Sequence, residues 1–152
     1  MRNTIDTIIS ILKPGMEEQD ADYFVRKWYT GDPLAVNNSE APAGAVIPSQ
    51  PNPRIAVFVG EDIVTETVCI RFFQPAIRSM SENFEIAASL TKLLSMVEQA
   101  SLLLRTDPTF GGTFVSSSIT NITPMLPGVP DTNTYRIAEI TFEIKTRRSW
   151  GQ

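Results

Sequence analysis

The sequence predicts an α+β fold: a mainly antiparallel sheet with an N-terminal helix and a long central helix packed on one face. Two segments, 3–13 and 81–105, carry apolar residues at helical spacing. Strand-like segments follow one another between these helices, over 54–73, and after them, over 114–145. Runs of neighbouring strands separated by helices are typical of α+β domains. The length of 152 residues predicts a single domain with enough chain to bury a core.

The first helix is predicted from an amphipathic pattern over 3–13. Its apolar stripe consists of residues at positions i, i+3, i+4 and i+7, namely Ile5, Ile8, Ile9 and Leu12. Pro14 and Gly15 then stop the helix. Aromatic residues fall on both faces of the segment 23–29, where we expect a short strand.

The segment 31–53 is predicted to be one long loop, because it is rich in proline, asparagine and serine. Its prolines are Pro33, Pro42, Pro48, Pro51 and Pro53. A loop of this length is usually functional or disordered. It is therefore either a surface insertion or an arm that becomes ordered on a partner. A second loop, rich in proline and glycine, is expected over 124–133.

Two strands joined by a tight connection are predicted over 54–60 and 63–73. The first strand carries apolar residues on both faces, so we expect it to be covered on both sides. The second strand is apolar on one face and half exposed to water on the other. Its apolar face carries Val64, Val68, Ile70 and Phe72, together with Glu66.

The long helix predicted over 81–105 ends before Pro108, because a proline disfavours helical geometry at the residue before it. Gly111 and Gly112 then let the chain reverse. The Ser/Thr-rich segment 114–122 has little to bury. It is predicted to be an edge strand, or a strand that pairs with another subunit.

The closing strand, 135–145, has the clearest alternation in the chain. Its inward residues are Ala138, Ile140, Phe142 and Ile144. A C-terminal tail, 147–152, follows and contains Arg147, Arg148 and Trp150. We expect this tail to dock on a neighbouring subunit or to fray.

Composition excludes several classes of function. The net charge of −4 argues against a nucleic-acid-binding face, although DNA could still slide past a mildly negative wall. The single cysteine, Cys69, cannot form an internal disulfide, which favours folding in a reducing compartment. We see no signal peptide and no apolar run of the roughly 20 residues that a membrane span needs. We therefore expect a protein that folds in a cytoplasm, without a membrane partner.

No catalytic constellation emerges from the sequence. The chain contains no histidine, no phosphate-binding glycine loop and no nucleophile elbow. Cys69 has no histidine partner and is interpreted as a half-buried structural residue. The acidic cluster at 17–22 lacks the spacing and central glycine of a calcium loop. We expect neither an enzyme nor a bound cofactor or metal.

A family resemblance rests on two segments. The first is 102–112, Leu-Leu-Leu-Arg-Thr-Asp-Pro-Thr-Phe-Gly-Gly, and the second is 138–147, Ala-Glu-Ile-Thr-Phe-Glu-Ile-Lys-Thr-Arg. Together they resemble the tail terminator proteins of tailed bacteriophages, which are also called tail completion or minor tail proteins. The motif residues are Asp107, Pro108, Gly111 and Gly112. The order of an N-terminal helix, a loop, a strand pair and a long helix agrees with this family as well.

The resemblance implies a structural virion protein of the phage neck, assembled in the host cytoplasm. It implies an α+β subunit that forms a homohexameric ring on the end of the tail tube. The ring would join the tube to a head-side connector or stopper protein, and DNA would pass through its lumen only as cargo. The implied mechanism is competition, since the ring occupies the surface that another tube subunit would use. The family has no catalytic residues.

Two other interpretations stay open. The chain could be a different neck or tail component, such as a head-completion stopper or a sheath-associated subunit. It could also be a small α+β ligand-binding domain or enzyme, which would need a concave pocket with converging polar groups. For an assembling protein, the possible subunit-interface residues are Pro48, Pro51, Pro127, Arg147, Arg148 and Trp150.

Overall fold

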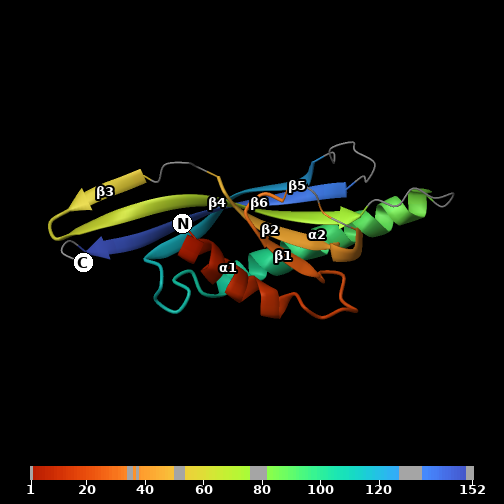
Figure 1. Ribbon diagram of the computed structural model, residues 1–152, viewed down its shortest axis with the longest axis horizontal. Helices are drawn as coiled ribbons and strands as arrows, with labels where there is room; N and C mark the ends of the chain where they lie inside the picture. Colours follow the sequence, from red (N-terminus) through yellow and green to blue (C-terminus); the bar gives the residue numbers. More distant parts are fainter. Residues whose placement is uncertain are drawn as a thin grey trace.

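The computed structural model describes residues 2–33, 36, 38–49, 54–75, 82–126 and 135–149. Two α-helices and a six-stranded sheet make up this part of the chain (Figure 1). In chain order the elements are α1 (Arg2–Gly15), β1 (Lys27–Thr30), the 3₁₀ helix η1 (Asn38–Glu40), β2 (Ala43–Pro48), β3 (Arg54–Phe58), β4 (Glu61–Pro75), α2 (Glu82–Thr106), β5 (Ser116–Leu126) and β6 (Tyr135–Ser149). The predicted α+β class is confirmed.

The sheet is built around β4 and β6, which pair antiparallel over 15 residues each, from Glu61↔Ser149 to Pro75↔Tyr135. The strand order is β1-β2-β4-β6-β5, and β3 pairs with the first part of β4 outside this path. Only the pairing of β1 with β2 is parallel. The sheet is therefore mainly antiparallel, as the alternating sequence patterns predict.

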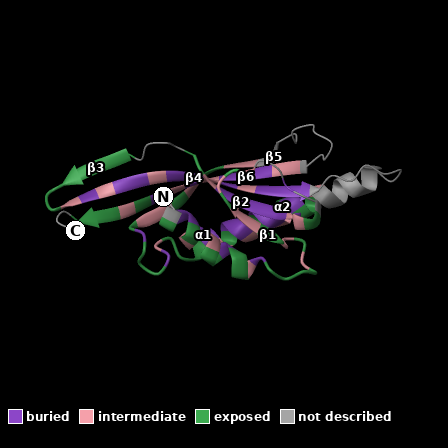
Figure 2. Cartoon of the chain, in the orientation of Figure 1, coloured by how far each residue is buried: buried purple, intermediate pink, exposed green. Residues whose placement is uncertain are grey.

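One face of the sheet carries the main core. The inward residues of the closing strand, expected from alternation, are all buried, and Phe142 is 1% exposed. Val68, Ile70 and Phe72 of β4 lie beside them on the same face, as predicted. Both helices contribute to this core, which also holds Ile8 of α1 among its fully buried side chains (Figure 2).

The apolar stripes of the helices explain how they pack. The members of the α1 stripe that are fully buried or nearly so are Ile5, Ile8 and Leu12, and Met16 extends the stripe by one turn. The side chains of α2 are described from Leu90 onward, and the buried ones are Leu93, Met96, Val97, Ala100, Ser101 and Leu104. The Gln99 amide of α2 donates a hydrogen bond to the Gly15 carbonyl at 3.1 Å, which holds the end of α1 against α2.

The prediction of a continuous loop over 31–53 is wrong. The segment contains η1 and the strand β2, which lies between β1 and β4 in the sheet. The small apolar run Ala43–Val46 is buried throughout. The prolines that suggested a loop flank this strand instead of interrupting it, because Pro42 precedes it and Pro48 is its last residue. A second cluster, on the opposite sheet face, contains Val36, Ala41, Ala43, Ala45 and Phe73.

The C-terminal tail predicted over 147–152 is also corrected. β6 continues to Ser149, so Arg147 and Arg148 are strand residues paired with Ile63 and Asp62 of β4. The alternation that predicts the strand ends at Lys145, because residues 146–149 are all polar. The backbone ladder with β4 nevertheless extends the strand. Trp150 lies outside the described residues.

Candidate functional site

The main candidate site is a three-stranded projection that we call the arm. It consists of β3, residues 61–65 of β4 and residues 145–149 of β6. Figure 1 shows that these strands extend past α1, away from the layer that the helices cover. The prediction that the first of these strands is covered on both sides is therefore wrong. Every residue of β3 is exposed, because neither helix reaches it (Figure 2).

The arm exposes large apolar side chains in sequence. Ile55 is 48% exposed, Val57 67% and Phe58 54%, and Val59 at the hairpin tip is fully exposed. The turn is tight because Gly60 adopts a positive φ of 84°, a conformation that glycine reaches without steric cost. Single exposed apolar residues are common on soluble proteins, but four within five consecutive positions are not. Alternation places Ile55 and Val57 on one face of the strand and Phe58 on the other, so the end of the arm is apolar on both faces. Clustered exposed apolar residues of this kind mark interaction surfaces.

Ion pairs between strands hold the arm together. Arg54 of β3 reaches across β4 to Glu143 of β6, with Nη2 2.9 Å from Oε2. Arg147 pairs with Glu61 at 2.7 Å, and Arg148 pairs with Asp62 at 2.9 Å. Each exposed pair stabilises the fold by at most about 1 kcal/mol. Their larger consequence is electrostatic, since these three arginines are paired within the chain although their side chains stay more than half exposed.

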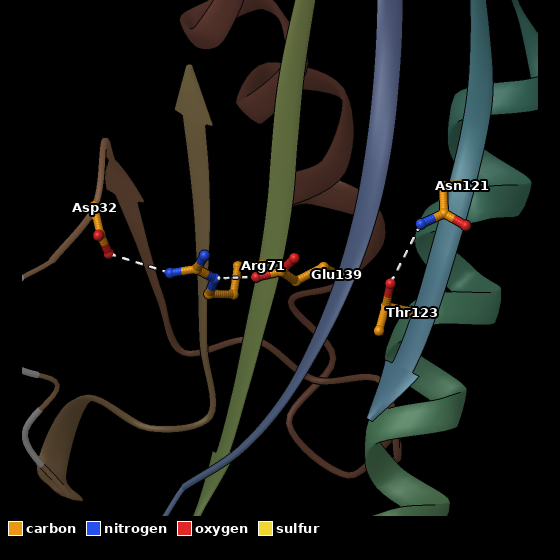
Figure 3. Close-up of polar contacts among 5 residues, drawn as sticks. All are labelled: Asp32, Arg71, Asn121, Thr123 and Glu139. Atoms are coloured by element: carbon orange, nitrogen blue, oxygen red, sulfur yellow. Dashed lines mark hydrogen bonds and ion pairs between the residues drawn. The ribbon is translucent and has the colours of Figure 1, made fainter. Parts of the chain in front are cut away.

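The sheet face opposite the helices carries a polar network. Arg71 of β4 donates from Nε to Glu139 of β6 at 2.7 Å, and its Nη1 lies 3.4 Å from Asp32, which follows β1 (Figure 3). Farther along this face, the Asn121 amide of β5 donates to the Thr123 hydroxyl at 3.4 Å. The Arg71 contacts tie β4 to β6 and to the segment after β1, whereas the Asn121 contact lies within β5. They provide no nucleophile and no acid–base pair.

Cys69 lies beside this network and is half-buried. Burial, and after it the Glu139 carboxylate, which repels a thiolate, together raise the pKa of its thiol to about 11. At neutral pH the thiol is therefore protonated and a weak nucleophile. We expect alkylation by iodoacetamide to follow a pH profile with its midpoint about two units above that of the unfolded chain. A thiol that reacts fully at pH 8 in the folded protein would contradict this assignment.

The family-motif residues form a turn after α2. The Asp107 carboxylate accepts hydrogen bonds from the Gly111 amide at 2.6 Å, the Thr109 amide at 3.2 Å and the Thr109 hydroxyl at 3.0 Å. Phe110, Gly111 and Gly112 all have positive φ values, of 49°, 68° and 90°. The turn inserts Phe110 into the core, where its ring contacts Phe114 and Phe142 at centroid distances of 4.9 and 6.0 Å. The motif therefore has a structural role in this chain.

The turn also predicts a pH dependence. The hydrogen bond from the Gly111 amide, followed by that from the Thr109 hydroxyl, holds the pKa of Asp107 below its ordinary value of 3.8. The contribution of this carboxylate to stability is therefore fully present above pH 3.8 and is lost as the pH falls through the lower, folded-state pKa. We expect the stability difference between wild type and Asp107→Asn to shrink below pH 4. Parallel urea titrations at pH 3 and pH 7 measure it, and a difference that is the same at both values would contradict the role of the carboxylate.

One concave site lies between the segment after α1 and the sheet. It is a half-open cavity of about 360 Å³, and its lining includes Asp20, Asp22, Arg26, Lys92 and Gln74. Gln74 is 7% exposed, and its side-chain oxygen has no hydrogen-bond partner. Charged side chains of both signs line the same cavity, and Cys69 is not in the lining. Within the described residues, no group of three or more histidine, cysteine or acidic side chains could hold a metal ion.

The structure gives the positions of only some of the predicted interface residues, and their role stays a prediction. Pro48 lies exposed at the end of β2, opposite Val68 of β4. Arg147 and Arg148 lie on the arm, where they pair with Glu61 and Asp62. Pro51, Pro127 and Trp150, like most of the predicted 124–133 loop, lie outside the described residues. The apolar residues of β3 were not selected from the sequence. Their signal was three consecutive large apolar residues, 57–59, directly before a turn glycine.

Across the part of the chain that the structure describes, no helix is long and apolar enough to cross a membrane. Comparison of the sequence with protein-family models and with curated proteins finds no match.

Proposed function

We propose that this chain is a structural virion protein, a tail terminator that forms a ring on the end of a phage tail tube. The observation that carries the proposal is the arm, which projects from the helix-covered body and exposes Ile55, Val57, Phe58 and Val59. A chain of this size gains no stability of its own from exposing these residues. They lose their contact with water only when a partner covers them.

The motif resemblance gives this surface its proposed context. The ring, a hexamer by the resemblance, binds the tube end and occupies the surface that the next tube subunit would use. It then presents its other side to the head-side connector or stopper. DNA passes through the lumen as cargo, and assembly takes place in the host cytoplasm. In this mechanism the binding energy of the ring on the tube end stops further tube growth, and no catalytic residue or cofactor takes part.

The proposal is tested by measuring the size of the purified protein. We expect light scattering at micromolar concentration to give a closed oligomer, and negative-stain images to show rings and rings bound to tail tubes. A protein that stays monomeric and does not bind added tubes would refute it. Images of the particle also separate a terminator from a stopper or a sheath-associated subunit, because each occupies its own axial level.

A matched pair of variants locates the assembling surface. We expect the double substitution Val57→Ser with Phe58→Ser to weaken association at least 100-fold. This reflects the loss of roughly 3 kcal/mol or more of apolar burial at each contact. Leu102→Ser is the control, because Leu102 is 62% exposed on α2, away from the arm. We expect this control to associate as wild type does. Equal weakening by both would show that the effect is not specific to the arm.

A second candidate function, ligand binding, is favoured by one observation. Gln74 is buried against the 360 Å³ cavity with an unpaired side-chain oxygen, which could accept a hydrogen bond from an amide or ammonium group. Thermal-shift screening of small amides and amines tests this function. The substitution Gln74→Leu should abolish any stabilisation that such a ligand gives.

A further inference from the structure

The described sheet has four exposed strand edges, and two of them are protected against pairing with another strand. β1 is only four residues long and begins with Lys27. The end of β6 that extends past β5 carries the charged residues Arg147 and Arg148. Short strands and charged side chains are the usual means by which proteins block edge-to-edge association.

The other two edges, β3 and β5, lack unpaired charged side chains, although β3, with five residues, is also short. β5 contains no charged residue over Ser116–Leu126. The only charged residue of β3 is Arg54, whose guanidinium pairs with Glu143. Burying either edge would therefore not remove an unpaired charge from water. The desolvation of unpaired charges is the main cost of closing a polar interface. Both edges are open to association.

The backbone of β3 presents hydrogen-bonding groups toward the open side. Phe58 and Glu61 close the two-residue turn at Val59 and Gly60. Such a closing pair is hydrogen-bonded, and pairs alternate along an antiparallel ladder. Ile55 and Val57 are therefore the residues whose N–H and C=O groups point away from β4. A strand placed beside β3 could form hydrogen bonds with the N–H and C=O groups of these two residues.

The edge of β5 offers a segment of matching length. The ladder of β5 with β6 is regular from Ser116 to Ile119 and is interrupted after Ile119. Irregularities of this kind disfavour strand addition, so the available part of β5 is this short stretch. It is about as long as β3, and three of its four residues are small serines, of which Ser117 donates to the Pro108 carbonyl at 2.6 Å.

The two open edges lie on opposite sides of the same sheet, because β3 borders β4 whereas β5 borders β6. We infer that β3 of one copy pairs with the Ser116–Ile119 stretch of β5 in the next copy, so that the sheets of neighbouring subunits join edge to edge. Contact between two unlike edges is heterologous, and it propagates until the rotation between copies closes a ring. The inference rests on the proposed ring and identifies the strands that build it.

The experiment is disulfide trapping in the full chain, in a Cys69→Ser background. Val57→Cys is combined in turn with Ser116→Cys, Ser117→Cys and Ser118→Cys, so that both faces and neighbouring registers of β5 are sampled. Directly paired strands place Cα atoms about 4.5–5.5 Å apart, within the range that a disulfide bridges. After mild oxidation, we expect at least one double variant to give a ladder of covalent oligomers on non-reducing gels. Each single variant should stay monomeric on the same gels.

Covalent dimers from Val57→Cys alone, with no ladder from any double variant, would show that like edges pair, and would overturn the inference. Rings seen by light scattering without any cross-link would also overturn it, while leaving the proposed function intact. A wild-type protein that is monomeric with and without tail tubes would refute the proposed function itself, and this inference with it.

Discussion

Replacing Phe142 with alanine is expected to lower the free energy of unfolding by about 3–5 kcal/mol. Phe142 is 1% exposed and lies on the helix-facing side of β6, the strand that pairs with both β4 and β5. Its ring stacks on Phe110, which the turn after α2 holds in a left-handed conformation. The substitution therefore leaves a cavity where the sheet, α2 and the motif turn meet. The backbone of a central strand cannot move to fill it.

The matched control is Phe58→Ala on the arm. Phe58 is 54% exposed, so its truncation should change the unfolding free energy by no more than about 1 kcal/mol. Urea titrations at a concentration where the wild type is monomeric compare the two variants. In assembly assays we expect the opposite order, with Phe58→Ala weakening association. Equal destabilisation by both variants would contradict the division into a core and an arm.

The elements that the sequence predicts well are those whose pattern repeats over many residues. The closing strand alternates without a break from Ala138 to Lys145, and its inward residues, from Ala138 to Ile144, are all buried. The stripe in α1 recurs over about two turns and identifies Ile5, Ile8 and Leu12 as core residues. In both cases one hydrophobic face is enough to determine the type of element and its orientation.

The sequence does not predict β2, because tertiary contacts determine that this segment forms a strand. The run Ala43–Ile47 is short, and it consists partly of small residues with low strand propensity. Its pairing with β4 and β1 decides its conformation, and neither pairing is visible in the local sequence. A consequence is that 43–48 cannot be removed as a dispensable loop, since its deletion would take a buried strand out of the sheet.

The prediction that β3 is covered on both faces fails for a related physical reason. A strand that is apolar on both faces indicates burial on both faces, and the sequence cannot say whether the cover comes from the same chain. For β3 the described part of the chain supplies none. The choice of proline and basic residues as interface candidates therefore leaves out Ile55 and Val57, which the proposed function places at a contact. An apolar residue without cover in its own chain is the better indicator of a contact.

Gly44→Val is the second substitution with a large expected effect, a loss of about 1–3 kcal/mol. A Cβ at position 44 would lie 2.6 Å from Cζ3 and 2.8 Å from Cε3 of the Trp28 ring. β1 and β2 pair in register here, with Trp28 beside Gly44, so the indole lies across the glycine. The ring also meets Phe72 edge-on at a centroid distance of 5.9 Å. It cannot swing away from a new side chain without losing that contact.

A double-mutant cycle separates this clash from a general effect on the strand. Trp28→Ala removes the ring and leaves room at position 44. The double variant should therefore lose less stability than the sum of the two single variants, by 1 kcal/mol or more. Indole fluorescence in a Trp150→Phe background, where Trp28 is the only tryptophan, should report a more exposed ring in Gly44→Val. Strict additivity with an unchanged spectrum would mean that the ring does not hold β1 against β2. The parallel edge of the sheet would then depend on backbone pairing alone.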